Sequence, residues 1–175
     1  MPRPSLLDAE ERRTLTAFAG AAKAVLMAVD RDLERDAGMP RAYYEILYFL
    51  DSAPERSMRM SELADATRSQ ASRITHAVAR LEESGFVRRE LCAADRRGWF
   101  TVLTDDGKAA LERARPAFAE SVRRRLIAHL SPADRRELAR LGELLLAAHD
   151  DTETDDERPR RRRDPDRASQ GALIP

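Results

Sequence analysis

Apolar residues recur at steps of three and four along most of this chain, which is the period of one face of an α-helix. The first run covers about residues 8–36 and predicts a long amphipathic helix. Gly38 and Pro40 interrupt the run, and a second helix is expected from about Tyr44 to a break before Ser52. The chain is therefore expected to begin with a long helix and a shorter one.

The middle of the chain predicts two further helices. A short one is expected at residues 62–66, with Ser61 as its N-cap. Ser69 is expected to cap the next helix, which ends at Gly85 because glycine favours the backbone conformation that closes a helix. The predicted buried stripe of this helix consists of Ile74, Val78 and Leu81.

Two segments rich in aromatic and β-branched residues follow, at 86–92 and 99–104. The residues between them are charged and turn-forming, so the sequence predicts a β-hairpin with a basic tip. A fifth helix is expected from Asp105 to about Leu130, with a kink at Pro116, and Ser131 caps a sixth helix.

This order of elements predicts a mostly α protein with a small β-hairpin, the α+β layout of a winged helix-turn-helix. The predicted lobe covers residues 52–104 within one domain of residues 1–150. The flanking helices, at 8–36 and 105–150, have apolar faces with few partners in one chain, so we expect a homodimer. Residues 151–175 are charged and almost without apolar side chains, which predicts a disordered tail.

Composition excludes several other classes of protein. The 175 residues hold 31 basic and 31 acidic side chains, so the chain is not a uniformly basic coat protein. Cys92 is the only cysteine, which excludes an intrachain disulfide and a thiolate zinc site within one chain. His76, His129 and His149 lack partners at metal-ligand spacing, and no catalytic pair stands at a usable spacing. We therefore expect no enzyme, no cofactor and no metal.

The sequence also predicts where the protein acts. No apolar run reaches the roughly 18 residues that a membrane span needs, and the first residues lack the apolar core of a signal peptide. We therefore expect a cytoplasmic protein without a membrane partner.

Positive charge gathers in the predicted lobe although the whole chain sums to zero. From Arg68 to Phe100 there are seven arginines and four acids, a surplus of three. The polar face of the fourth helix, opposite its apolar stripe, carries side chains that can bond base edges or phosphates in a major groove. These candidate DNA-binding residues are Ser69, Gln70, Ser72, Arg73, Thr75, His76 and Arg80.

The hairpin resembles the wing of the MarR family of transcriptional regulators. Asp95-Arg96-Arg97-Gly98 matches the family's Asp-x-Arg turn, and Leu103-Thr104-Asp105-Asp106-Gly107 matches its Leu-Thr-x-x-Gly helix start. Met60-Ser61-Glu62-Leu63-Ala64 and Arg80-Leu81-Glu82-Glu83-Ser84-Gly85 match the flanking helices. The resemblance covers about residues 15–148.

This resemblance implies a homodimeric regulator of double-stranded DNA, which we expect to be a repressor with a near-palindromic operator. It implies that Arg97, with Arg96, enters the minor groove, while Asp95 holds the turn. A narrow minor groove concentrates negative potential and therefore attracts arginine. It also implies an effector site between the dimer region and the DNA-binding lobe. Thr67 and Arg68 depart from the pattern, because this turn is often more apolar in the family.

The effector site and the function each have alternative interpretations. Tyr43, Tyr44 and Tyr48 lie where a small aromatic or anionic effector would bind in the family, although plain core packing is the simpler interpretation. Cys92, beside the wing, gives a redox-sensing regulator as an alternative. A further alternative is a winged-helix module that binds proteins without specific DNA binding.

Overall fold

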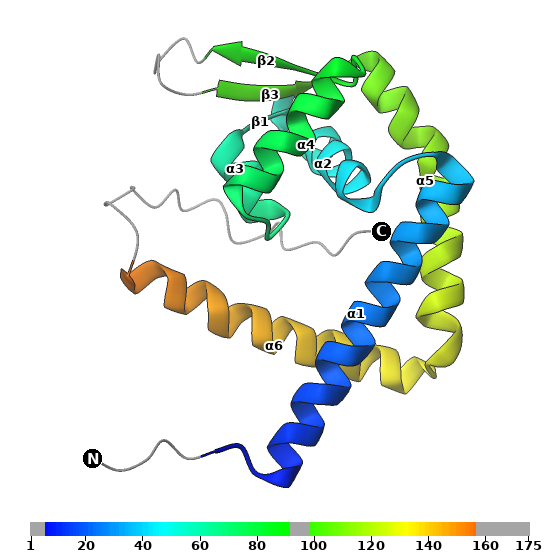
Figure 1. The fold of residues 1–175 in the computed structure, drawn as a ribbon, viewed down its shortest axis with the longest axis vertical. Helices are drawn as coiled ribbons and strands as arrows, with labels where there is room; N and C mark the ends of the chain where they lie inside the picture. The colour runs from blue at the N-terminus through cyan, green and yellow to red at the C-terminus, as the bar shows by residue number, and fades with distance from the viewer. Residues whose placement is uncertain (1–5, 92–98, 157–175) are drawn as a thin grey trace. The chain divides into compact units, whose positions relative to one another are not determined.

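The computed structural model of the chain describes residues 6–91 and 99–156. The chain divides into two compact units, Met1–Arg125 and Leu126–Pro175. The first unit is mostly helical with one small antiparallel sheet (Figure 1). This confirms the predicted fold class.

Two helices open the first unit, as the sequence predicts. Helix α1 (Ala9–Ala37) begins at a capping box, in which Asp8 and Glu11 each accept from the other's backbone amide. It ends at Gly38, whose φ of 63° suits glycine because no Cβ opposes it. Helix α2 (Arg41–Ser52) then packs its apolar face into the core.

The helix-turn-helix consists of α3 (Met60–Ala66) and α4 (Ala71–Glu83). Strands β2 (Val87–Leu91) and β3 (Trp99–Leu103) form the predicted hairpin. A third strand, β1 (Ser57–Arg59), follows the single turn η1 (Pro54–Arg56) and pairs with the other edge of β3. The sheet order is therefore β1-β3-β2, one strand more than the sequence predicts.

Helix α5 (Asp105–Arg125) returns from the sheet and packs along α1 (Figure 1). It continues through Pro116, so the proline does not end the helix. The helix ends five residues before the predicted Leu130, and the 3₁₀ turn η2 (Ile127–His129) follows in the second unit. The core of the first unit lies between α1, α2, α4, α5 and the sheet; its fully enclosed side chains include Leu33, Ile46, Leu47, Leu50, Leu63, Val78 and Leu111.

The second unit is dominated by helix α6 (Pro132–Asp156). Ser131 caps it as predicted, because the Ser131 hydroxyl accepts from the Asp134 amide at 3.2 Å. The helix runs past residue 150 into the segment that the sequence predicts as a tail, and residues 157–175 lie outside the described part of the chain. Within the described residues, no helix is both long enough and apolar enough to cross a membrane.

Candidate nucleic-acid interface

Helix α4 has one buried face and one exposed face. Ile74, Val78 and Leu81 are almost completely buried, as their spacing predicts. The predicted DNA-binding residues that are exposed on or beside this helix are Gln70, Ser72, Arg73, Thr75, His76 and Arg80. The structure therefore brings together a continuous polar surface on α4 opposite the core.

The turn before α4 differs from its prediction. Gln70, not Ser69, is the N-cap, and its side chain forms no capping hydrogen bond. The half-buried Ser69 instead donates its hydroxyl to the Thr67 carbonyl oxygen at 3.2 Å, so this hydroxyl serves the turn. Thr67 in turn donates to the Leu63 carbonyl at 2.7 Å. The backbone amides at the positive end of α4 are thus without a side-chain cap, which suits a phosphate.

Two arginines of this region form exposed ion pairs. Arg80 pairs with Glu83 at 2.9 Å, and Arg88 pairs with Glu90 at 2.7 Å. Exposed pairs of this kind contribute at most about 1 kcal/mol to stability. Both guanidinium groups can therefore exchange a carboxylate for a phosphate at little cost.

A second set of contacts fixes the hairpin against α4. The backbone amide of Arg89 donates to Glu82 Oε1 at 3.2 Å, and Arg89 Nε lies 3.3 Å from Glu82 Oε2. Glu82 therefore joins the end of α4 to β2 through both the backbone and the side chain of one residue.

The base of the hairpin is joined to α5 by Thr104 and Gly107. The Thr104 hydroxyl donates to the Gly85 carbonyl at 2.7 Å and accepts from the Gly107 amide at 3.0 Å. The Thr104 amide donates to the Phe86 carbonyl at 3.1 Å. A Cβ at position 107 would lie 2.0 Å from the Phe86 carbonyl oxygen, so only glycine fits the observed packing. The Leu-Thr-x-x-Gly motif is thus the joint between wing and helix.

Asp95, Arg96 and Arg97, predicted for the minor groove, lie outside the described residues, as does Cys92. The described part of the hairpin ends at the cross-strand pair Leu91 and Trp99.

The three tyrosines proposed for an effector do not share one environment. Tyr44 and Tyr48 are buried, and Tyr44 stacks on Phe118 of α5 with ring centroids 4.3 Å apart. Burial raises the pKa of Tyr44. Tyr43 instead lines an open hollow of about 620 Å³ whose other walls come from α4, at Arg73, His76, Ala77, Ala79, Arg80 and Glu83. Tyr44 and Tyr48 are therefore core residues here, and Tyr43 alone faces this hollow.

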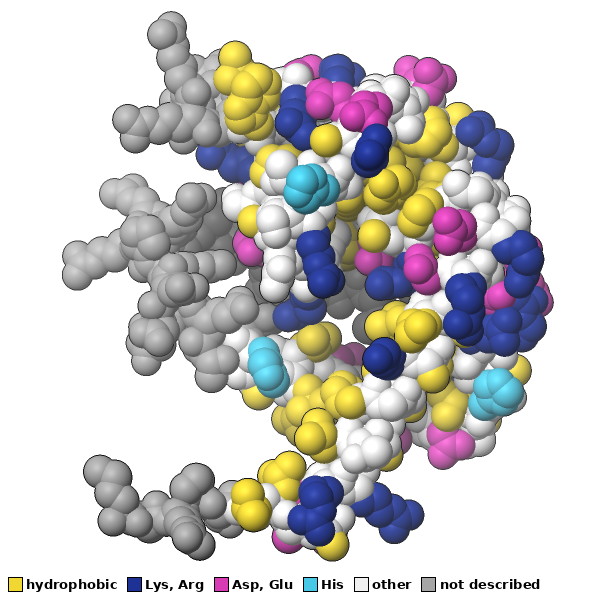
Figure 2. Space-filling view, in the orientation of Figure 1, with side chains coloured by type: hydrophobic (Ala, Val, Ile, Leu, Met, Phe, Trp, Pro, Cys, Tyr) yellow, Lys and Arg dark blue, Asp and Glu magenta, His cyan; other side chains and the backbone are white. Residues whose placement is uncertain are grey.

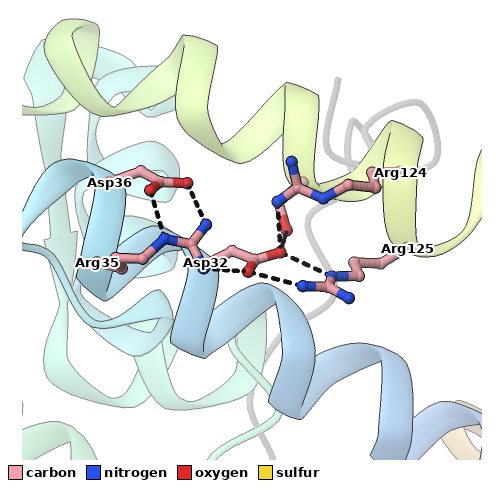
Figure 3. A network of polar contacts seen from close by, with 6 residues as sticks. Asp32, Arg35, Asp36, Arg124 and Arg125 are labelled. Carbon is pink, nitrogen blue, oxygen red and sulfur yellow. Dashed lines mark hydrogen bonds and ion pairs between the residues drawn. The ribbon is translucent and has the colours of Figure 1, made fainter.

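A buried carboxylate joins α1 to the end of α5 (Figure 3). Only 1% of the Asp32 side chain is exposed. It accepts two hydrogen bonds from Arg125, at 2.8 and 2.9 Å, and one from Arg124 at 2.8 Å. Ser121 donates at 2.8 Å and Arg35 at 3.0 Å. The hydrogen bonds from Arg125 and then Arg124 hold the pKa of Asp32 far below its usual range, although burial acts in the opposite direction.

Sequence reasoning missed this cluster. Its signal was an acidic residue inside the apolar stripe of α1, next to Val29 and Leu33, together with a run of three arginines at the end of α5. The cluster fixes the end of α5 against α1. Among the described residues, no group of three or more His, Cys, Asp or Glu side chains is placed to hold a metal ion.

Comparisons with known proteins agree with this arrangement. The model of the MarR family matches residues 37–98. Sco3205, a MarR family transcriptional regulator from Streptomyces coelicolor solved in complex with DNA, is 39% identical; the match covers 85% of this chain and 92% of that one, with a TM-score of 0.77. AbsC, a MarR family regulator from the same organism, is 33% identical, with 82% and 97% coverage and a TM-score of 0.74.

A more distant structure shares the fold. BpsR from Bordetella bronchiseptica, described for the regulation of its DNA binding by 6-hydroxynicotinic acid, is 21% identical. The match covers 76% of this chain and 98% of that one, with a TM-score of 0.67. No curated protein sequence matches the chain. The identity and coverage shared with the two Streptomyces proteins show that this chain belongs to the MarR family of transcriptional regulators.

Proposed function

We propose that this protein is a homodimeric regulator that binds specific double-stranded DNA through α4 and the β2–β3 hairpin. The observation that carries the proposal is the exposed polar face of α4, which lies opposite a buried apolar stripe and is fixed to the hairpin by Glu82 and Arg89. The relative Sco3205 has been solved in complex with DNA, which supports DNA binding by this chain.

The chemistry of α4 divides between base edges and phosphates. Arg73 can donate two hydrogen bonds to a guanine edge, and Gln70 can pair with an adenine edge. Ser72, Thr75 and the uncapped amides of the first turn suit phosphate oxygens. Asp95, Arg96 and Arg97 are proposed for the minor groove from the sequence alone.

The proposed dimer rests on apolar side chains that each unit leaves exposed. On α1 these are Leu15, Phe18, Leu26 and Met27, and on α6 they are Leu138, Leu141, Leu144, Leu145 and Leu146. Runs of exposed leucine on a helix mark a surface that another chain covers. A two-fold dimer then requires a near-palindromic operator with half-sites about 10 base pairs apart.

We further propose that the protein is a repressor in the cytoplasm and that a small aromatic or anionic molecule releases it. The hollow beside Tyr43 supports an effector site, because Arg73 and Arg80 line it and belong to the helix proposed to read DNA. BpsR, whose DNA binding is regulated by 6-hydroxynicotinic acid, has the same fold. Release requires that the effector bind the DNA-incompetent form more tightly, and a coupling of about 1–3 kcal/mol lowers operator affinity about 5- to 150-fold.

The test is a titration of the full chain into labelled duplexes taken from the DNA next to its own gene, followed by fluorescence anisotropy. Arg73→Ala is expected to weaken binding to the specific duplex by about 1–3 kcal/mol while it changes binding to unrelated DNA much less. Arg113→Ala is the matched control, because it removes one exposed arginine from α5, outside the proposed interface. Equal loss on all duplexes would contradict base reading by Arg73.

Salt dependence separates DNA binding from a protein-binding module. Phosphate contacts release counterions, so affinity must fall steeply between about 50 and 200 mM salt. A chain that binds no duplex at low salt would overturn the proposed function.

A further inference from the structure

The described end of the hairpin carries an apolar pair that this protein leaves uncovered. Leu91 is 60% exposed and Trp99 is 48% exposed. The two residues face each other across β2 and β3. Figure 2 shows hydrophobic side chains gathered beside the grey tip of the hairpin. An exposed tryptophan next to an exposed leucine is a surface that a partner can cover.

The alternation of strand residues shows which face of the sheet carries this pair. Residues two apart on a strand share a face, so Leu91 and Trp99 lie on the face of Arg89 and Thr101. Thr101 is completely buried and contacts Met60 of α3, with Oγ1 and Sδ 3.1 Å apart. Arg89 pairs with Glu82 of α4. The apolar pair therefore extends the sheet face that packs on α3 and α4, beyond the point where the two helices cover it.

Charge decides between two occupants of this surface. The segment from Arg68 to Phe100 has a surplus of three positive charges. A second copy would bring the same surplus to the contact, and like charges oppose it. The DNA backbone offers negative phosphates beside the apolar carbons of deoxyribose, so it satisfies the arginines and the apolar pair together.

We propose that Trp99 and Leu91 pack against deoxyribose on the DNA backbone beside the major groove that α4 is proposed to occupy. This inference rests on the proposed function and adds an apolar contact to it. The contact holds the wing on the duplex without reading a base, so it strengthens binding to every sequence alike.

The chain itself carries the reporter for this contact, because Trp99 is its only tryptophan. The full chain is titrated with a duplex of about 30 base pairs and mixed sequence, long enough for two half-sites about 10 base pairs apart. Emission from Trp99 is expected to change at the same DNA concentration as anisotropy, and acrylamide is expected to quench it less in the complex. These changes report burial of the indole ring on DNA.

Two variants test whether DNA binding depends on an apolar ring at position 99. Trp99→Ala is expected to weaken binding about tenfold on both specific and unrelated duplexes, the loss that corresponds to uncovering roughly 50 Å² of apolar surface. Its salt slope is expected to match the wild type, because no phosphate contact is lost. Trp99→Phe is expected to bind close to the wild-type level, and thermal melting verifies that both variants fold.

The outcomes distinguish this inference from the proposed function. If the wild type binds the duplex while Trp99 emission and the affinity of Trp99→Ala stay unchanged, the wing contact is wrong and DNA binding by α4 stands. If emission changes with protein concentration in the absence of DNA, the pair is an interface between copies and the inference is overturned. A wild type that binds no duplex overturns both.

Discussion

Replacement of Gly107 by alanine is the sharpest test of how the hairpin is joined to the rest of the protein. The added Cβ would lie 2.0 Å from the Phe86 carbonyl oxygen and 2.8 Å from Leu103 Cδ1. Real Cβ atoms keep at least 3.0 Å from such neighbours, so α5 and the start of β2 must separate by about 1 Å. The nearest obstacle is a backbone atom, which cannot rotate out of the way as a side chain can.

The expected loss of stability in Gly107→Ala follows from overpacking and from the hydrogen bonds that the shift strains. Overpacked sites usually lose about 1–3 kcal/mol, and we expect Gly107→Ala to reach about 3 kcal/mol because Thr104 also depends on this spacing. Its amide and hydroxyl bonds, at 3.1 and 2.7 Å, both span the same joint. A loss of about 3 kcal/mol lowers the Tm by about 6–12 °C in a chain of this size.

Thermal melting by circular dichroism measures this effect, with Gly20→Ala as the matched control. Gly20 lies in α1 with no atom within 4 Å of an added Cβ, so alanine there is expected to stabilise the helix by up to about 1 kcal/mol. If Gly107→Ala melts at the wild-type temperature, the close approach of α5 to Phe86 is wrong.

Four further predictions concern the core, the effector site, the buried carboxylate and the dimer. Tyr44→Ala should cost about 3–5 kcal/mol because its ring stacks inside the core, whereas Tyr43→Ala should change the Tm little and weaken effector binding measured by thermal shift. Asp32→Asn should lower the Tm at pH 7, and its deficit should shrink as the pH falls below about 4. Leu141→Asp with Leu145→Asp should give monomers or unfolded chains in light scattering.

Three outcomes would contradict these predictions. The pKa of Asp32 is lower in the folded chain than in the unfolded one, so its carboxylate stabilises the fold above the unfolded pKa and loses this effect in acid. If the Tm deficit of Asp32→Asn stays constant down to pH 3, the Asp32 cluster is not its source. Normal effector binding by Tyr43→Ala would show that the effector does not bind in the hollow beside Tyr43. A double leucine variant that remains dimeric would exclude α6 from the interface, and Glu143→Lys on the same helix is its control.

The elements that the sequence predicts well are those whose pattern is local. The stripe of α4 is visible because Ile74, Val78 and Leu81 repeat at helical spacing, and the hairpin is visible from its β-branched and aromatic residues. Strand β1 escapes this reasoning because it has only three residues and exists through pairing with β3, at Ser57 opposite Val102.

Other differences have separate causes. Ser69 is a good N-cap by type, but its hydroxyl has a competing acceptor in the Thr67 carbonyl. The partners of Asp32 on α5 lie about ninety positions further along the chain, so no local window contains them. The motif around Gly107 is readable in the sequence, whereas the reason for glycine, the approach of Phe86, appears only after folding.

Two copies of this chain are proposed to bind one DNA site, and a hydroxyl-radical footprint on the DNA next to its own gene measures whether they do. We expect two protected backbone segments related by a two-fold axis, with centres about 10 base pairs apart, and weaker protection of both in the Arg73→Ala variant. Full cleavage of this DNA at protein concentrations that saturate the labelled duplexes in the anisotropy titration would contradict binding by two copies. A single protected segment without two-fold symmetry would contradict it as well.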